Sequence, residues 1–532
     1  MNIKMKHILC YFFILLCSFN YLRAQKSASS SKGVIATAHP LATQAGLDVL
    51  EKGGNAFDAA VAASFVLSVT EPSMSGLGGR LQALYYNYKT GPKGIDATTQ
   101  VPMKYIADVS KAEDGFKTIG IPGMVKGIIK MHKENGILPL NKVLAPAINL
   151  AKYGFVLLPD EALRQSMVRR SLSTFPGSTK YFLINDSTRQ ANTVFRQPQL
   201  AKTIKAISKD EGKSFYNGKI AKDISNEITS GGGFLQVSDL QQYNALDAKI
   251  LKGSYRGYDI VAMGLPCYGA IVIEMLNLLE KTDLAKADET KWVLAHAAAH
   301  HKAYEDRSLL KKDEDKVASL PFANDRWMAP LPTAMQYDTN LHSNGHTTHF
   351  VVSDQKGNVV SVTQSLGPLL GSKVASEKHG FLFATTMGPY LGNMEPLERA
   401  SSHISPVLVF KDGKPVLALG AAGGARIVPA VVQVISRFID QNLSLEKAVE
   451  AARIYQLPEK LLVENHEGNL WQHPQTIPNL KKLNLPLEEV KLPGQMGRVH
   501  ALFYDASLGK WHAAADPDWS GTALGLKPDI KQ

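Results

Sequence analysis

The sequence predicts an α+β protein, because two β-hairpin patterns occur in a chain whose middle part is mostly helical. Residues 350–354 and 359–365 are largely β-branched or apolar and flank a Lys-Gly-Asn turn, which is typical of a β-hairpin. Residues 401–410 and 415–419 predict a second hairpin around Lys-Asp-Gly-Lys. Between the N-terminal part and the first hairpin, apolar residues mostly recur at helical spacing.

Composition indicates a globular chain with a sizeable core. It has 532 residues, of which 45% are hydrophobic and 20% charged. The formal net charge is +11, but Lys alternates with Asp and Glu and forms no basic block. We therefore expect a basic solvated surface and no nucleic-acid partner.

The first 24 residues are typical of a signal peptide. Lys4 and Lys6 precede an apolar stretch at 8–22, and the small residue Ala24 follows. No other long apolar segment occurs, so we expect a periplasmic or secreted protein without a membrane span after cleavage at residue 24. Two of the three cysteines would leave with this segment, and Cys267 alone predicts no intrachain disulfide.

The mature N-terminal part predicts a strand from Gly33, a helix at 40–52 and an Ala-rich second helix capped by Asn55. A Gly-rich turn at 75–80 then leads into a strand at 81–88. Further predicted elements are helices at 119–133, 138–154, 199–211, 223–229, 271–279 and 292–308, and a strand at 255–261. Residues 309–344 are rich in Lys, Asp, Pro and Asn and predict an exposed loop.

Thr347 lies where the first hairpin begins, directly after His346. A threonine hydroxyl becomes a nucleophile when a base lies within reach, and an N-terminal threonine supplies its own α-amino group. We therefore expect the chain to cut itself at the bond between His346 and Thr347. Later, a strand is expected at 381–387, and a glycine-rich turn leads into a helix at 427–440. Its paired Gly423 and Gly424 can present backbone N–H groups as an oxyanion hole does.

These motifs together resemble the gamma-glutamyltranspeptidase family over essentially the whole mature length. Each is weak alone, but their order and spacing match. They are residues 44–46, 53–61, 122–127, 255–258, 306–308, 347–350, 357–358, 401–406 and 420–427.

The resemblance implies an N-terminal-nucleophile fold, a four-layer αββα sandwich. Cleavage before Thr347 would give a large subunit, 25–346, and a small subunit, 347–532, which stay together as one domain. Thr347 would then be the nucleophile, with Gly423 and Gly424 as oxyanion donors. Ser365 stands where the family has a threonine that hydrogen-bonds the nucleophile. The implied substrates are gamma-glutamyl or related amides of small molecules or peptides, with the acyl group passed to water or an amine.

The chain departs from the family at the groups that hold the glutamyl head. The family's arginine in Asp-Phe-Arg-Glu is Thr98 here, an aspartate is replaced at Pro389, and an expected asparagine is Gly367. Ser401 and Ser402 are the remaining α-carboxylate contacts. Because a site that loses buried charge partners rejects the charged ligand, ordinary glutathione chemistry is in question.

Arg80 replaces a family glycine, and either supplies a relocated carboxylate contact or caps a turn at the surface. The linker between Tyr390 and Ser401 is short, which favours a pocket open to bulkier substrates. An acylase for non-glutamyl amides is therefore one alternative. A second alternative is a non-catalytic exported binding protein of the same fold.

No metal or cofactor is expected. His296 and His300 have helical i, i+4 spacing suitable for a metal, but no glutamate follows His296 as in metalloproteases. The chain has no P-loop, no G-x-S-x-G elbow and no G-x-G-x-x-G opening a helix.

Overall fold

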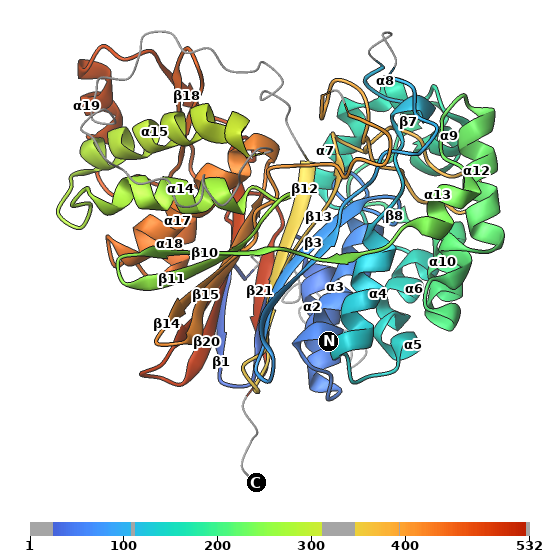
Figure 1. The fold of residues 1–532 in the computed structure, drawn as a ribbon, viewed down its shortest axis with the longest axis horizontal. Helices are drawn as coiled ribbons and strands as arrows, with labels where there is room; N and C mark the ends of the chain where they lie inside the picture. Colours follow the sequence, from blue (N-terminus) through green and yellow to red (C-terminus); the bar gives the residue numbers. More distant parts are fainter. Residues whose placement is uncertain (1–24, 108–111, 311–345, 393, 528–532) are drawn as a thin grey trace, which may run out of the picture.

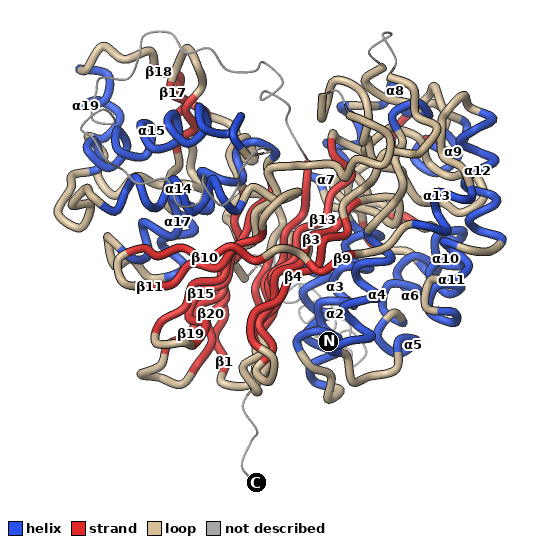
Figure 2. Tube along the Cα trace, in the orientation of Figure 1, coloured by secondary structure: helices blue, strands red, loops and turns tan. Residues whose placement is uncertain are grey.

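Two antiparallel sheets of seven strands each lie face to face at the centre of the molecule (Figures 1 and 2). The computed structural model describes residues 25–107, 112–310, 346–392 and 394–527. The predicted signal peptide and nearly all of the predicted loop at 309–344 fall outside these residues. No helix within the described residues is long and apolar enough to cross a membrane.

The first sheet, called here the β12 sheet, carries the predicted nucleophile. Its strand order is β21-β2-β12-β13-β3-β4-β9. The strands are β2 (Val34–Thr37), β3 (Arg80–Asn87), β4 (Gly91–Ala97), β9 (Leu246–Asp247), β12 (His346–Ser353), β13 (Val359–Gly367) and β21 (Thr522–Gly525). The predicted first hairpin is therefore present as β12 and β13, at the centre of this sheet.

The second sheet, called here the β15 sheet, has the order β1-β20-β19-β15-β14-β11-β10. Its strands are β1 (Ser27–Ser30), β10 (Ile250–Tyr255), β11 (Tyr258–Met263), β14 (Val407–Lys411), β15 (Lys414–Ala422), β19 (Arg498–Asp505) and β20 (Lys510–Ala515). The predicted second hairpin corresponds to β14 and β15.

Side-chain alternation explains why both faces of the β12 sheet are buried. Phe350 and Val352 belong to the core against the helices, whereas Val351 packs between the sheets. Because successive residues of a strand face opposite sides, an almost continuous apolar run needs cover on both faces.

Helices supply the two outer layers. The β15 sheet is covered by α14 (Gly269–Glu280), α15 (Glu289–Asp306), α17 (Ile427–Ile439) and α18 (Leu445–Glu450), which share one core with its strands. The β12 sheet is covered by α2 (Pro40–Glu51), α3 (Ala56–Thr70), α4 (Met124–Asn135) and α6 (Ala145–Tyr153). Figure 2 shows these helices on either side of the central strands. The predicted four-layer αββα sandwich is confirmed.

The remaining elements lie outside the sandwich layers. The helices are α5 (Leu140–Val143), α7 (Pro159–Met167), α8 (Arg169–Leu172), α9 (Pro176–Phe182), α10 (Pro198–Asp210), α11 (Lys213–Tyr216), α12 (Lys219–Ser230), α13 (Val237–Gln242) and α19 (Thr476–Lys482). Short sheets are formed by β5 (Phe155–Val156) with β8 (Val194–Phe195), by β6 (Leu183–Ile184) with β7 (Ser187–Thr188), and by β16 (Ile454–Gln456), β17 (Leu461–Glu464) and β18 (Leu487–Val490). Single 3₁₀ turns are η1 (Phe116–Thr118), η2 (Arg307–Leu309) and η5 (Gly424–Arg426).

Helix α3 begins where the sequence predicts it. Asn55 accepts hydrogen bonds from the N–H groups of Phe57 and Asp58, and Asp58 accepts one from Asn55 in return. This capping box satisfies N–H groups that the first turn leaves unpaired. The helix is buried along its whole length and ends at Thr70, with Glu71 as its C-cap.

Two predicted strands differ from the structure. The stretch 255–261 contains the turn of the β10–β11 hairpin, because Arg256 and Gly257 adopt φ of 51° and 74°. The stretch 381–387 makes only isolated bridges, to residues such as Gly78 and Ile119. An apolar run marks burial, but it does not show whether a neighbouring backbone is available to form a ladder.

Candidate active site

Thr347, Ser365 and Arg80 form a row across three neighbouring strands of the β12 sheet. Thr347 on β12 is paired with Ser365 on β13, and Ser365 is paired with Arg80 on β3. Residues directly opposite in antiparallel strands project from the same face of the sheet. Strand register alone therefore brings together three residues that are far apart in the sequence.

The hydroxyl of Ser365 connects the nucleophile candidate to the bond that precedes it. Thr347 Oγ1 donates to Ser365 Oγ over 3.1 Å, and Ser365 Oγ donates to the carbonyl oxygen of His346 over 2.9 Å. The N–H of Gly367 donates to the same Ser365 Oγ over 2.9 Å. The register of the two strands shifts between His346 and Thr347. The peptide group between them is thus held in an irregular part of the ladder.

A cavity of ≈ 90 Å³ opens at this row. The predicted site residues that line it are Arg80, Thr347, Ser365, Ser401, Ser402 and Gly424. Gly424 begins η5 and follows Gly423, whose φ of 141° is outside the range that L side chains usually adopt. The first N–H groups of such a turn have no partner within the helix, so they can bind a developing oxyanion.

Thr98 does not line the cavity. It is fully buried, and its hydroxyl donates to the carbonyl oxygen of Ala400 over 2.7 Å. Ala400 directly precedes Ser401 and Ser402, so Thr98 contacts the segment that carries the two serines. Its position indicates that it supports this segment, and the structure does not bring it together with the other predicted substrate-binding residues.

Arg80 is a buried residue, with 1% of its surface exposed, so it does not cap a turn at the surface. Its Nη2 donates to the carbonyl oxygen of Thr385 over 2.5 Å. The guanidinium carbon lies 6.0 Å from the centre of the Tyr390 ring. Gly367 is close by: a Cβ there would lie 3.0 Å from Tyr390 Cε1 and 3.4 Å from Arg80 Nη2.

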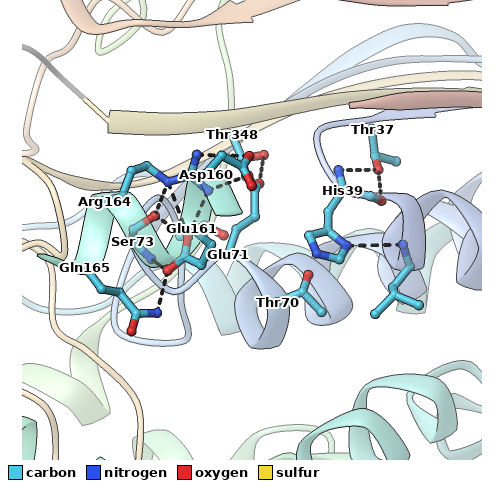
Figure 3. A network of polar contacts seen from close by, with 12 residues as sticks. Thr37, His39, Thr70, Glu71, Ser73, Asp160, Glu161, Arg164, Gln165 and Thr348 are labelled. Carbon is cyan, nitrogen blue, oxygen red and sulfur yellow. Dashed lines mark hydrogen bonds and ion pairs between the residues drawn. The ribbon is translucent and has the colours of Figure 1, made fainter. Parts of the chain in front are cut away.

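A buried network of charged and polar side chains contacts Thr348 of β12 (Figure 3). Thr348 Oγ1 donates to Glu71 Oε2 over 2.9 Å. Glu71 Oε1 lies 3.5 Å from Arg164 Nη2, which also pairs with Glu161 at 2.9 Å. Burial raises the pKa of Glu71 to about 7, although Arg164 opposes the shift. The sequence contained one signal for Glu71, a carboxylate that directly follows a largely apolar, Ala-rich helix.

His349 lies between the two sheets. Its Nδ1 is 2.8 Å from Thr363 Oγ1, and a Cβ on Gly420 of β15 would collide with its ring. Complete burial lowers its pKa to about 3, so the ring is neutral at physiological pH. The structure therefore indicates a packing role for this residue.

His296 and His300, whose helical spacing would suit a metal, make other contacts in the structure. His296 stacks on Trp292 at 4.0 Å, and His300 Nδ1 accepts from the N–H of Gln456 over 3.3 Å. Among the described residues, one other group has metal-like spacing: the ligand atoms of Glu464, His466 and Asp518 lie within 4.8 Å of one another.

His466 in that group faces the two carboxylates at ion-pair distance and makes no hydrogen bond to either of them among the described residues. Its Nδ1 accepts from the N–H of Gly468 over 3.3 Å, which leaves the proton on Nε2. Nε2 faces Glu464 at 3.5 Å and Asp518 at 3.8 Å. We therefore interpret the group as an ion-paired cluster.

Comparisons with known proteins agree with the fold and the motifs. The family model described as gamma-glutamyltranspeptidase matches residues 42–526. The glutathione hydrolase proenzyme of Bacillus subtilis (strain 168) is 30% identical over 548 residues, covering 93% of this chain and 91% of that protein. The acylase ACY 1 proenzyme of Pseudomonas sp. (strain V22) is 32% identical over 468 residues, covering 81% of this chain and 84% of that protein.

The same architecture occurs in a solved structure. The cephalosporin acylase from Bacillus halodurans superimposes with a TM-score of 0.86 at 24% identity, over 96% of this chain and 99% of that chain. At this identity the likeness supports the fold alone. Because the family model spans nearly the whole described chain, the protein belongs to the gamma-glutamyltranspeptidase family.

Proposed function

We propose that the chain is a self-processing amidohydrolase or acyltransferase of this family, with Thr347 as the nucleophile. The observation that carries the proposal is the pair of hydrogen bonds made by Ser365. This hydroxyl accepts from Thr347 Oγ1 and donates to the carbonyl oxygen of His346. One side chain thereby orients the attacking oxygen and polarises the carbonyl that it attacks.

Self-cleavage would proceed through an ester. Thr347 Oγ1 attacks the carbonyl carbon of His346, and the bond from that carbon to the Thr347 nitrogen breaks. The nitrogen takes up the proton and becomes a free α-amino group. Water then hydrolyses the ester and leaves a carboxylate on His346. The products are the proposed subunits, which begin after the predicted signal peptide and at Thr347.

Turnover would use the new N-terminus. The α-amino group of Thr347 accepts the hydroxyl proton as Oγ1 attacks the amide carbon of the substrate. Gly423 and Gly424 present N–H groups to the oxyanion, and the departing amine takes the proton. Water or an acceptor amine then attacks the threonyl ester. The acyl donor is a small-molecule or peptide amide, gamma-glutamyl or related.

The decisive test combines mass measurement with acyl labelling. The purified protein should run as two fragments, the smaller beginning at Thr347, whereas Thr347→Ala should remain uncut. Thr347→Ser keeps a hydroxyl at this position and should still be cut. An intact folded chain after long incubation would overturn the proposal.

Labelling separates an enzyme from a binding protein of the same fold. An electrophilic glutamine analogue or a slow acyl substrate should add its mass to the fragment that begins at Thr347. A cut protein that binds such ligands without acquiring a covalent adduct would instead favour the non-catalytic alternative.

A further inference from the structure

Arg80 is a buried cation, and no anion among the described residues pairs with it. Its Nη2 donates a hydrogen bond to a neutral acceptor, the carbonyl oxygen of Thr385, and its Nε has no hydrogen-bond partner within the described part of the chain. The described residues place no carboxylate in an ion pair with it, and the residue is 1% exposed. Burial lowers the pKa of Arg80. Because an arginine stays charged in proteins, a guanidinium held here strongly favours any anion that can reach it.

The nucleophile and this cation face the same cavity. Thr347 and Arg80 stand two strands apart in one row, with Ser365 between them, and all three line the cavity. Neighbouring strands are about 4.8 Å apart, so the two backbones are separated by roughly 10 Å. A short acyl chain attached to Thr347 Oγ1 can therefore bring its far end to the guanidinium.

The other charges at the cavity have the same sign. Arg307 also lines it, and no acidic side chain is found among its described lining residues. His403 lines it as well, but burial lowers the pKa of this histidine to about 3 and keeps it neutral. A carboxylate is attracted to such a cavity, and an ammonium group is repelled.

We infer that the acyl group accepted by this site carries a terminal carboxylate, bound by Arg80, and lacks the α-amino group of glutamate. The substrates are thus mono-amides of short dicarboxylic acids. This inference rests on the proposed function, because the acyl chain is measured from Thr347. Ser401 and Ser402 line the same cavity and can donate further hydrogen bonds to the carboxylate.

Three p-nitroanilides of equal chain length test the inference: glutaryl, pentanoyl and γ-glutamyl. Glutaryl carries the carboxylate, pentanoyl lacks it, and γ-glutamyl adds the ammonium group. We expect kcat/KM for glutaryl to exceed that for pentanoyl by roughly 100-fold, as for a hydrogen-bonded charge. The kcat/KM for the γ-glutamyl amide should be well below that for the glutaryl amide. Equal values for glutaryl and pentanoyl, or a preference for γ-glutamyl, would overturn the inference.

Substitution of Arg80 should remove this selectivity. In Arg80→Gln the ratio of glutaryl to pentanoyl turnover should fall to near one, and Arg80→Lys should retain an intermediate ratio. A purely structural arginine would lower both activities together and leave the ratio unchanged. Measuring the ratio within one variant removes the effect of partial misfolding, because both substrates meet the same folded fraction.

Binding of a product analogue gives a readout without turnover. Glutarate should raise the thermal midpoint of the wild-type protein and of uncut Thr347→Ala, but not of Arg80→Gln, and pentanoate should raise none of them. If no cleavage or turnover is seen while glutarate still stabilises the protein through Arg80, the proposed function fails and the carboxylate site stands. If turnover occurs but glutarate has no Arg80-dependent effect, the carboxylate site fails alone.

Discussion

Ser365 Oγ lies 2.9 Å from the carbonyl oxygen of His346 and donates a hydrogen bond to it. This hydroxyl also orients the oxygen of Thr347, so its loss removes both an orienting and a polarising contact. The contact is made in the uncut chain, before the N-terminus exists. We therefore expect loss of this hydrogen bond to affect self-cleavage directly, and turnover only through the amount of cut protein.

Ser365→Ala should slow self-cleavage by about 10²- to 10³-fold, the range found when one oxyanion donor is removed. The fraction of cut chain should be followed by gel densitometry after purification at low temperature. Ser365→Thr keeps a hydroxyl and serves as the control, with cleavage near the wild-type rate. Equal rates for the alanine and threonine variants would contradict this role.

Glu71 should make stability depend on pH. Its folded-state pKa is about 7, above the 4.5 of an unperturbed glutamate, so between these values the folded protein holds a proton that the unfolded chain releases. Stability is therefore lost as pH rises through this window. The loss is roughly 3 kcal/mol from a shift of this size.

Urea unfolding of the uncut Thr347→Ala background between pH 4.5 and 7.5 measures this effect. Adding Glu71→Gln should flatten the pH dependence over that interval, whereas Glu51→Gln, which changes an exposed carboxylate, should leave it as it was. Parallel curves for all three proteins would show that Glu71 does not hold the proton.

Thr98→Val should affect stability and not selectivity. The substitution leaves the buried carbonyl of Ala400 without its donor, which costs about 1 kcal/mol. Ser402→Ala alters a residue that lines the cavity, and should lower glutaryl turnover relative to pentanoyl turnover. Kinetics on the two amides and thermal midpoints for both variants distinguish the roles. If Thr98→Val changed the ratio of glutaryl to pentanoyl turnover, Thr98 would contact the substrate, contrary to this prediction.

Gly367→Asn, which restores the family's residue, should not restore a γ-glutamyl preference. A Cβ there would lie 3.0 Å from Tyr390 Cε1 and 3.2 Å from the carbonyl oxygen of Thr385, and the φ of 94° strains any residue with a side chain, so the substitution should cost about 2 kcal/mol. Thermal unfolding should show the loss. Gly367→Asn combined with Arg80→Gly should recover only a small part of the loss, because the positive φ and the contacts with Tyr390 and the Thr385 carbonyl remain. If Gly367→Asn alone were as stable as the wild-type protein, position 367 would not be crowded or strained as described.

Much of the site was predictable because its residues lie in regular strands. The β-branched and apolar residues of the first hairpin predict β12 and β13, and the observed register then places Thr347 beside Ser365. The Asn55 capping box is a local pattern and was equally visible. What the sequence did not reveal depends on long-range packing: Glu71 reaches Thr348 across 277 positions, and Thr98 turns to Ala400 across 302.

The same limit explains the errors in secondary structure. The stretch 381–387 has a strand-like composition, yet it lies beside segments that offer only single bridges. In 255–261, Arg256 and Gly257 form the turn of a hairpin, so only the residues from Tyr258 onward belong to β11. Periodicity identifies buried residues well, whereas ladder formation depends on which neighbour is present.

The closeness of Arg80, Gly367 and Tyr390 also constrains how this pocket can change over generations. An arginine at 80 is compatible with a residue lacking a side chain at 367, and each position sets what the other tolerates. If the residues at 80 and 367 are replaced one at a time, the intermediate protein has either two side chains competing for the same space or none filling it. Selectivity in this lineage should therefore switch by paired replacements, and libraries that vary 80, 367 and 390 together should find active variants that single-site libraries miss.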